Sequence, residues 1–133
     1  MFKIERKIHF SYGHRIMKHE GHCSHLHGHN GRVHIEIASE KLDALDRVMD
    51  FSRIRDSIGR WIDGELDHKM ILWEEDPLAS VLQQAGEPVV LMKENPTAEA
   101  MARWIFREAR RMGLPVTKVS FWETEHSCGM YEE

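Results

Sequence analysis

Two segments of this chain, residues 2–14 and 27–39, alternate apolar and polar side chains with the period of two that is typical of a β-strand. In the first segment the even positions are mostly apolar, and that series ends at His14. In the second segment the odd positions carry the apolar side chains, and His27 and His29 begin the series. Each predicted strand therefore turns one face to a core, and histidines close the apolar faces of both strands.

These three histidines have the spacing that metal sites use. A strand would place His27 and His29 on one face, about 6.5 Å apart along the chain. With His14 from a neighbouring strand they would supply three protein ligands and leave a fourth position for water or substrate, as in catalytic zinc sites. The paired Cys-x-x-Cys spacing of structural zinc sites is absent, which favours an open site, although Cys23 or His22 could still close it.

The other histidines of this region are expected to serve different purposes. Eight of the ten histidines lie between His9 and His34. His19, His22 and His25 fall in the Gly- and His-rich loop that joins the two strands, and His34 falls on the polar face of the second strand. We expect solvated rings at these positions. The alternative for the whole cluster is that each histidine packs singly with a hydrogen-bonded ring.

Length and charge exclude several classes of protein. A chain of 133 residues fits a single domain, 1–133, that buries about two-thirds of its unfolded surface. A net charge of −4 with both signs interspersed predicts no nucleic-acid or acidic-membrane partner. No apolar run approaches the ~20 residues of a membrane span, and the N-terminal pattern is a strand rather than a signal peptide, so we expect a cytoplasmic protein. Cys23 and Cys128 form no disulfide framework, which leaves thiols available for chemistry.

The pattern changes to a helical period after residue 50. Apolar side chains from Phe51 to Ile62 recur at three and four, behind Asp50 or Ser52 as a cap, and end near Gly64. A short helix is predicted over 76–85, before the apolar run 89–92. Asn95-Pro96 predicts a helix start with a cap followed by proline at the first position; an apolar face then runs from Ala98 to Met112, and Gly113 ends the helix.

The remaining segments complete an α+β layer with helices on one face of an antiparallel sheet. Residues 48–50 are expected to return as a short hairpin arm, and a last strand runs from 116 to about 125. Alternation puts Val119, Phe121 and Glu123 on one face of that strand. Glu123 is therefore either a pocket residue or a strand end that turns to solvent. So small a sheet leaves unpaired edges.

Several separated motifs, taken in their order along nearly the whole chain, resemble those of the 6-pyruvoyl-tetrahydropterin synthase family. Within that family the chain is most similar to the bacterial 6-carboxytetrahydropterin synthases of queuosine biosynthesis. The specific element is the three-residue gap between Cys23 and His27, since the animal enzymes carry a longer gap. The motifs are His14, Cys23-x-x-x-His27-x-His29, Asp50-Phe51, Leu66-Asp67-His68-Lys69, Asn95-Pro96-Thr97 and Glu123-Thr124.

The resemblance implies a tunnelling-fold (T-fold) subunit, in which a four-stranded antiparallel sheet carries two main helices on one face. Such subunits assemble into a β-barrel, here a homohexamer built as a dimer of trimers with sites between subunits. Barrel closure would pair the exposed strand edges. The resemblance also assigns roles: zinc bound by His14, His27 and His29, a pterin ring held by Glu123, and Cys23 as catalytic base supported by Asp67 and His68.

The implied reaction converts 7,8-dihydroneopterin triphosphate to 6-carboxy-5,6,7,8-tetrahydropterin, acetaldehyde and triphosphate. Zinc would polarise the substrate side chain, and a cysteine beside a cation can be a thiolate at neutral pH. A carboxylate can orient an imidazole for proton transfer, as Asp67 would orient His68, and Glu123 could make a two-point contact with a pterin. The alternatives are a 6-pyruvoyl-tetrahydropterin synthase, which only eliminates triphosphate, and a non-catalytic zinc-binding module.

Two features depart from the family pattern. The stretch from Leu72 to Lys93 is longer than the corresponding connection in compact bacterial members, and one residue alone separates Gly21 from Cys23. No segment clearly forms a triphosphate clamp. The candidates are Arg15, Lys18, Arg32 and Lys69, and solvated surface residues are the alternative for each.

Overall fold

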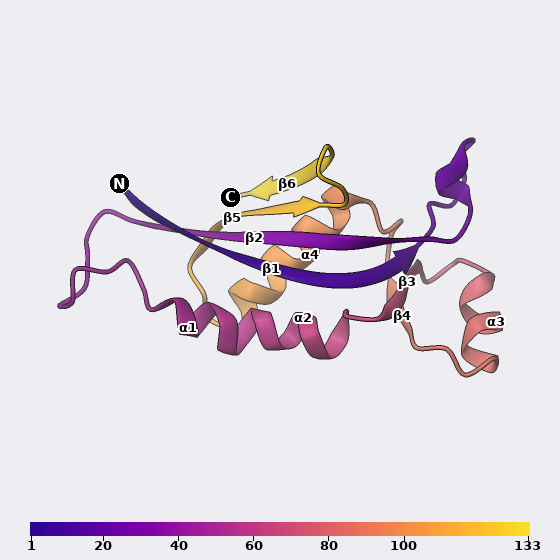
Figure 1. Cartoon of the computed structure of the whole chain (residues 1–133), viewed down its shortest axis with the longest axis horizontal. Helices are drawn as coiled ribbons and strands as arrows, with labels where there is room; N and C mark the ends of the chain where they lie inside the picture. Colours follow the sequence, from indigo (N-terminus) through magenta and orange to yellow (C-terminus); the bar gives the residue numbers. More distant parts are fainter.

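A computed structural model describes residues Met1–Glu133 as one curved sheet with helices packed against it (Figure 1). The sheet has six strands in the order β4-β3-β1-β2-β5-β6. The strands are β1 Phe2–His14, β2 His27–Ser39, β3 Lys69–Trp73, β4 Val89–Met92, β5 Val116–Trp122 and β6 Cys128–Glu132. The helices are α1 Phe51–Ile54, α2 Arg60–Glu65, α3 Leu78–Gln84 and α4 Ala98–Arg111.

The hairpin of β1 and β2 forms the centre of the sheet and has the predicted bounds. The two strands pair antiparallel along their whole length, with Phe2 opposite Ser39 and His14 opposite His27. Because the alternation of one strand is in register with that of the other, the apolar positions of both strands face the same side. The three histidines consequently lie together at one end of the hairpin.

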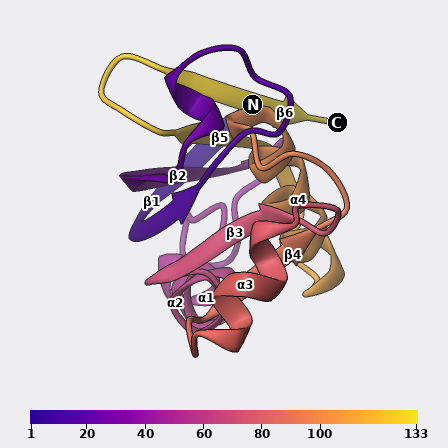
Figure 2. The ribbon, with the colours of Figure 1, turned by 90° about the vertical axis from the view of Figure 1, so that its right-hand side faces the viewer.

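The helices α1, α2 and α4 lie on the apolar side of the sheet, and α3 lies beside β4 at one end (Figure 1 and Figure 2). A single core cluster of 22 buried residues joins side chains of β1, β2 and β5 to those of α1, α2 and α4. Residues 51–65 are helical throughout, with a π-helical turn at Arg55–Gly59 between α1 and α2. The polar positions of β1 from Lys3 to His9 face away from this core and are exposed.

The predicted helix starts are partly right. Asp50 caps α1, since its carboxylate accepts a hydrogen bond from the Ser52 amide at 2.8 Å. The prediction for α4 was wrong by two residues: the cap is Thr97, whose hydroxyl accepts from the Ala100 amide at 3.2 Å. Asn95 does not cap the helix because its side chain bonds the backbone of Met17 instead.

The sheet differs from the predicted four antiparallel strands by two short parallel strands. β3 pairs parallel with the last three residues of β1, and β4 pairs parallel with β3. Parallel strands carry apolar runs rather than alternation, so 69–73 and 89–92 gave no strand period in the sequence. The last predicted strand ends at Trp122 rather than 125, and the short return strand β6 was missed.

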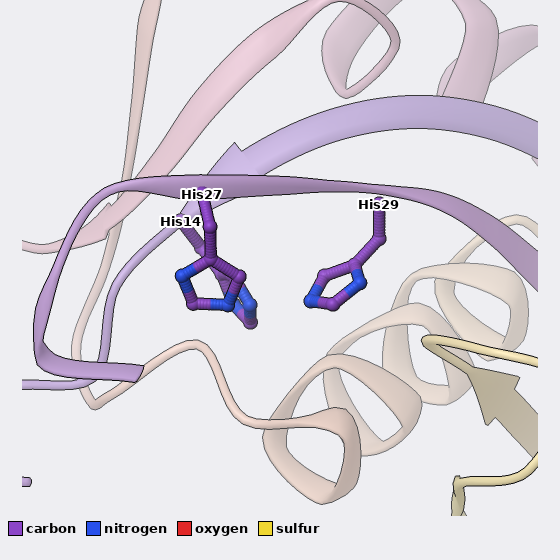
Figure 3. Close-up of side chains that lie close together, drawn as sticks. All are labelled: His14, His27 and His29. Carbon is purple, nitrogen blue, oxygen red and sulfur yellow. The ribbon is translucent and has the colours of Figure 1, made fainter. Parts of the chain in front are cut away.

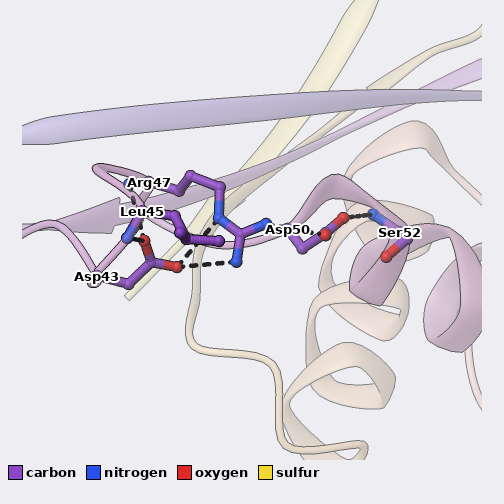
Figure 4. Close-up of polar contacts among 5 residues, drawn as sticks. All are labelled: Asp43, Leu45, Arg47, Asp50 and Ser52. Carbon is purple, nitrogen blue, oxygen red and sulfur yellow. Dashed lines mark hydrogen bonds and ion pairs between the residues drawn. The ribbon is translucent and has the colours of Figure 1, made fainter.

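Residues 48–50 are not the predicted hairpin arm. The segment between β2 and α1 is a loop held by two carboxylates and one guanidinium (Figure 4). Asp43 accepts from the amides of Leu45 and Arg47 at 2.8 and 3.0 Å, and Arg47 donates to both Asp43 and Asp50. These local side-chain bonds satisfy backbone groups that a strand would have paired.

Candidate metal and substrate site

His14, His27 and His29 converge at the end of the β1–β2 hairpin (Figure 3). One ring nitrogen from each histidine lies within 4.8 Å of the corresponding nitrogens of the other two. The ring centroids are 4.6 Å apart for His14 and His27, 5.0 Å for His27 and His29, and 5.1 Å for His14 and His29. The strand pairing thus brings together the three side chains that the sequence pattern selected.

Backbone carbonyls fix the orientation of two of these rings. His14 Nδ1 lies 2.8 Å from the Pro96 carbonyl oxygen, and His27 Nδ1 lies 2.7 Å from that of His25. A carbonyl can only accept, so each Nδ1 carries the proton and each Nε2 keeps a free lone pair. The Nε2 atoms of His14 and His29 are buried and have no hydrogen-bond partner. Such an orphaned buried pair of acceptors fits a metal ion.

The electrostatics of the site favour neutral imidazoles at His14 and His29. Burial lowers the pKa of His14 to about 4, and the neighbouring His27 and His29 lower it further while the Pro96 carbonyl opposes the shift. Burial also lowers the pKa of His29, with a smaller contribution from His27. Both rings are therefore unprotonated at pH 7, which is the state that coordinates metals.

A cavity of about 260 Å³ opens beside His14. Cys23 and Glu123 line it, and Glu123 Oε1 lies 3.9 Å from His14 Nε2. Burial raises the pKa of Glu123, Glu99 adds to this shift, and His27 opposes it. Of the two interpretations of Glu123, a residue at the cavity wall agrees with the structure and a turn into solvent does not.

Cys23 lies in the short 3-10 turn His22–Ser24, and its thiol is partly buried. The loop closes on itself because the Ile16 amide donates to the Cys23 carbonyl at 2.7 Å. Neither Cys23 nor His22 belongs to the group of potential ligands. The structure therefore brings together three candidate metal ligands, and the Cys23 thiol is not among them.

Asp67 and His68 form a pair at a different place. Asp67 Oδ2 lies 2.9 Å from His68 Nδ1, and the Ser11 amide donates to Asp67 Oδ1 at 2.9 Å. The Ser11 hydrogen bond is the main cause of the lowered pKa of Asp67, and His68 contributes further. The His68 side chain is 80% exposed and lines a second cavity with Ser11 and Lys69. Within one chain, this pair does not reach the cavity of Cys23.

Sequence reasoning missed the cavity wall formed by α4 and β6. Thr97, Glu99 and Cys128 line the same cavity as Glu123. They meet there because Gly129 packs directly on the first turn of α4, where a Cβ atom would lie 2.6 Å from backbone atoms of Ala98 and Glu99. The signal in the sequence was Gly129, since a glycine within a strand marks a close backbone approach, but the strand around it was not predicted.

The four basic residues considered for triphosphate all have partners within the chain. Arg15 pairs with Asp76, and Lys69 donates to the Gly64 carbonyl at 2.6 Å. Lys18 lies over the ring of Trp73 at 5.5 Å and Arg32 over that of Trp122 at 6.0 Å. Of the four, Arg32 also lines a polar cavity together with His29 and Glu123.

Comparison with solved structures defines the class of protein first. A structure of Caenorhabditis elegans 6-pyruvoyl tetrahydropterin synthase superposes with a TM-score of 0.73 at 20% identity, covering 99% of this chain and 95% of that one. An uncharacterized protein of Wolinella succinogenes superposes with a TM-score of 0.84 at 24% identity, covering 99% and 98%. The fold is that of a T-fold subunit.

The sequence then gives the family. Residues 3–133 match the family described as 6-pyruvoyl tetrahydropterin synthase, and the chain belongs to it. It is 39% identical over 110 residues to a 6-carboxy-5,6,7,8-tetrahydropterin synthase of Rickettsia conorii, and the aligned residues cover 81% of this chain and 80% of that protein.

None of the helices combines the length and apolar character that a bilayer crossing needs.

Proposed function

We propose that this protein is a zinc-dependent lyase that converts 7,8-dihydroneopterin triphosphate and one water molecule to 6-carboxy-5,6,7,8-tetrahydropterin, acetaldehyde and triphosphate. The observation that carries the proposal is the convergence of three histidine side chains, two with unpartnered buried Nε2 atoms, where His14 lines a cavity together with the Cys23 thiol and the half-buried Glu123 carboxylate. The similarity to the Rickettsia conorii enzyme supports the carboxy product over the pyruvoyl product.

His14, His27 and His29 would hold the zinc ion. When bound, zinc supplies Lewis-acid polarisation of oxygens on the substrate side chain. Cys23, at the same cavity, would take a proton from the polarised side chain as general base. Glu123 would bind the pterin, because a carboxylate can accept from two adjacent N–H donors, and this contact would offset the desolvation that raises its pKa.

The position of Asp67 and His68 is explained if the active site is shared between subunits. β3 covers β1 only from Tyr12 to His14, so the outer edge of β1 before Ser11 is unpaired, as is the outer edge of β6. The unpaired backbone groups of an edge strand can pair with a strand of another chain. Antiparallel pairing of β1 with β6 of the next copy would close the sheets into a barrel. In the register where the end of the free β1 edge meets the first residue of β6, that pairing would bring Ser11 next to Cys128.

The consequence is a composite site in a homo-oligomer, for which we propose a hexamer built from two trimers. Ser11 holds Asp67 through its amide, and Cys128 lines the cavity of Cys23. A neighbouring subunit would therefore deliver His68 to the cavity that its own chain does not reach. The assembly should elute at a multiple of three subunits.

Mixing two inactive variants tests the composite site. Cys23→Ala keeps His68, and His68→Ala keeps Cys23, so a randomly mixed assembly contains intact sites where the two types adjoin. About a quarter of the sites should recover activity in an equal mixture of co-expressed chains. Activity that stays at the level of the separate variants would contradict a shared site.

Product analysis tests the reaction. The zinc-loaded enzyme is incubated with 7,8-dihydroneopterin triphosphate, and aldehyde is trapped while the pterin is analysed by mass spectrometry. We expect acetaldehyde and the carboxypterin in equal amounts. Triphosphate without acetaldehyde, with all three side-chain carbons retained, would assign the pyruvoyl reaction, and no turnover with zinc fully bound would favour the non-catalytic module.

A further inference from the structure

The loop that carries Cys23, residues 15–26, is anchored at its beginning to segments that are distant in the sequence. Arg15 bonds Asp76, which lies between β3 and α3, and Met17 bonds Asn95, which precedes α4. Figure 1 places the loop and α3 at the same end of the sheet. We call residues 15–26 the cysteine loop.

The Arg15–Asp76 pair is largely buried and has a fixed two-point geometry, unlike an exposed surface ion pair. Arg15 Nε donates to Asp76 Oδ2 at 2.7 Å, and Nη2 donates to Oδ1 at 2.5 Å. The Asp76 side chain is 0% exposed and that of Arg15 is 19% exposed. Asp76 Oδ1 also accepts from the Leu78 amide at 2.9 Å, which fixes the carboxylate to the start of α3. Two parallel hydrogen bonds set the angle as well as the position of the guanidinium.

The anchored residues flank the one that holds Cys23. Ile16 lies between Arg15 and Met17, and its amide donates to the Cys23 carbonyl at 2.7 Å. The Asn95 side chain bonds both the amide and the carbonyl of Met17, at 2.8 and 3.1 Å. The position of Ile16 is thus fixed from both sides, and through one backbone hydrogen bond it fixes Cys23.

We propose that Asp76, acting through Arg15, is a positioning residue that holds Cys23 in place at the cavity beside His14. Its role as a positioning residue for catalysis rests on the proposed function; its control of the cysteine loop does not. The long connection from Leu72 to Lys93 supplies the Asp76 carboxylate for this contact. Because Asp76 engages the Arg15 guanidinium, Arg15 is not free to bind triphosphate. Moving a catalytic group by about 1 Å can lower the rate by about 10²-fold, so a flexible cysteine loop would slow the reaction.

The test uses two variants that break the contact in different ways and one matched control. Arg15→Lys keeps the charge and loses the two-point geometry, and Asp76→Asn keeps the shape and loses the charge. Asp56→Asn is the control, because Asp56 makes the same kind of two-point pair with Arg55 on an exposed helix. Each zinc-loaded protein is assayed for kcat, KM and the rate at which iodoacetamide alkylates Cys23, followed by peptide mass spectrometry.

We expect Arg15→Lys and Asp76→Asn to lower kcat by about 10-fold or more while KM changes by less than about threefold. Alkylation of Cys23 should rise by about fivefold or more, since the loop exposes the thiol more often. Asp56→Asn should match the wild type in all three measurements. Wild-type alkylation and kcat in folded Arg15→Lys protein would overturn the proposal, whatever the stability of Asp76→Asn. An enzyme that makes no pterin product while Cys23 responds as expected would overturn the proposed function and leave the control of the loop intact.

Discussion

Replacing Gly129 by alanine tests the contact that forms the cavity wall. Gly129 is buried in β6 against the first turn of α4, and a Cβ atom there would lie 2.6 Å from the Ala98 carbonyl carbon and the Glu99 nitrogen. Ordinary van der Waals contact begins at 3.4 Å. Both neighbouring atoms belong to backbone, so β6 and α4 must separate, and no side chain can rotate away to relieve the overlap.

The expected cost is at the upper end of the range for overpacking, about 3 kcal/mol. For a chain of this size, about 1 kcal/mol corresponds to roughly 3–4 °C, so Tm should fall by about 10 °C. Thermal unfolding of metal-free protein, followed by circular dichroism at one fixed concentration, measures the shift without the contributions of metal and assembly changing between samples.

Gly64→Ala provides the matched control. Gly64 is exposed in α2, and nothing lies within 4 Å of its added Cβ. Alanine is the better helix former by about 1 kcal/mol, so this variant should be as stable as the wild type or more stable. If Gly129→Ala melts within about 1 °C of the wild type, β6 does not pack on α4 as described and the account of the cavity wall is wrong.

Three further predictions concern the site and its supports. His27→Ala should lose most of the bound zinc while His34→Ala keeps it, as measured by metal analysis after gel filtration, and full retention in His27→Ala would remove that histidine from the site. Cys23→Ala should keep zinc and the oligomer yet lose turnover by about 10²–10⁴-fold, and loss of zinc would instead make Cys23 a ligand. Asp76→Asn should cost about 3 kcal/mol of unfolding free energy at pH 7. Arg15 lowers the pKa of Asp76 below its ordinary 3.8, so that stability is present above pH 3.8 and is lost as the pH falls further. The difference in unfolding free energy between metal-free wild type and Asp76→Asn should therefore shrink below pH 4. A constant difference down to pH 2 would refute the charge pair.

The hairpin and the histidine cluster could be predicted because their signals are local. Period-two alternation determined which face of β1 and β2 is buried, and His14, His27 and His29 continue that face. The helices were predictable for the same reason, from apolar side chains at helical spacing. The T-fold and the family followed from the motifs taken together, which the comparisons bear out.

The rest depends on contacts between distant segments. β3 and β4 are short apolar runs, and only the Tyr12–His14 end of β1 determines that they join the sheet as parallel strands. The cap of α4 shifted to Thr97 because Met17 engages Asn95 from 78 residues away. The second cavity around His68 and the wall around Glu99 likewise arise from packing that no sequence period records.

X-ray absorption at the zinc edge tests most directly the central claim, which is an open three-histidine site beside a free thiol. Protein loaded with one zinc per chain is measured without substrate. The account predicts nitrogen and oxygen neighbours alone at about 2.0–2.1 Å, with three of them imidazoles. A sulfur neighbour at about 2.3 Å would show that a cysteine closes the site, and would contradict an open three-histidine site.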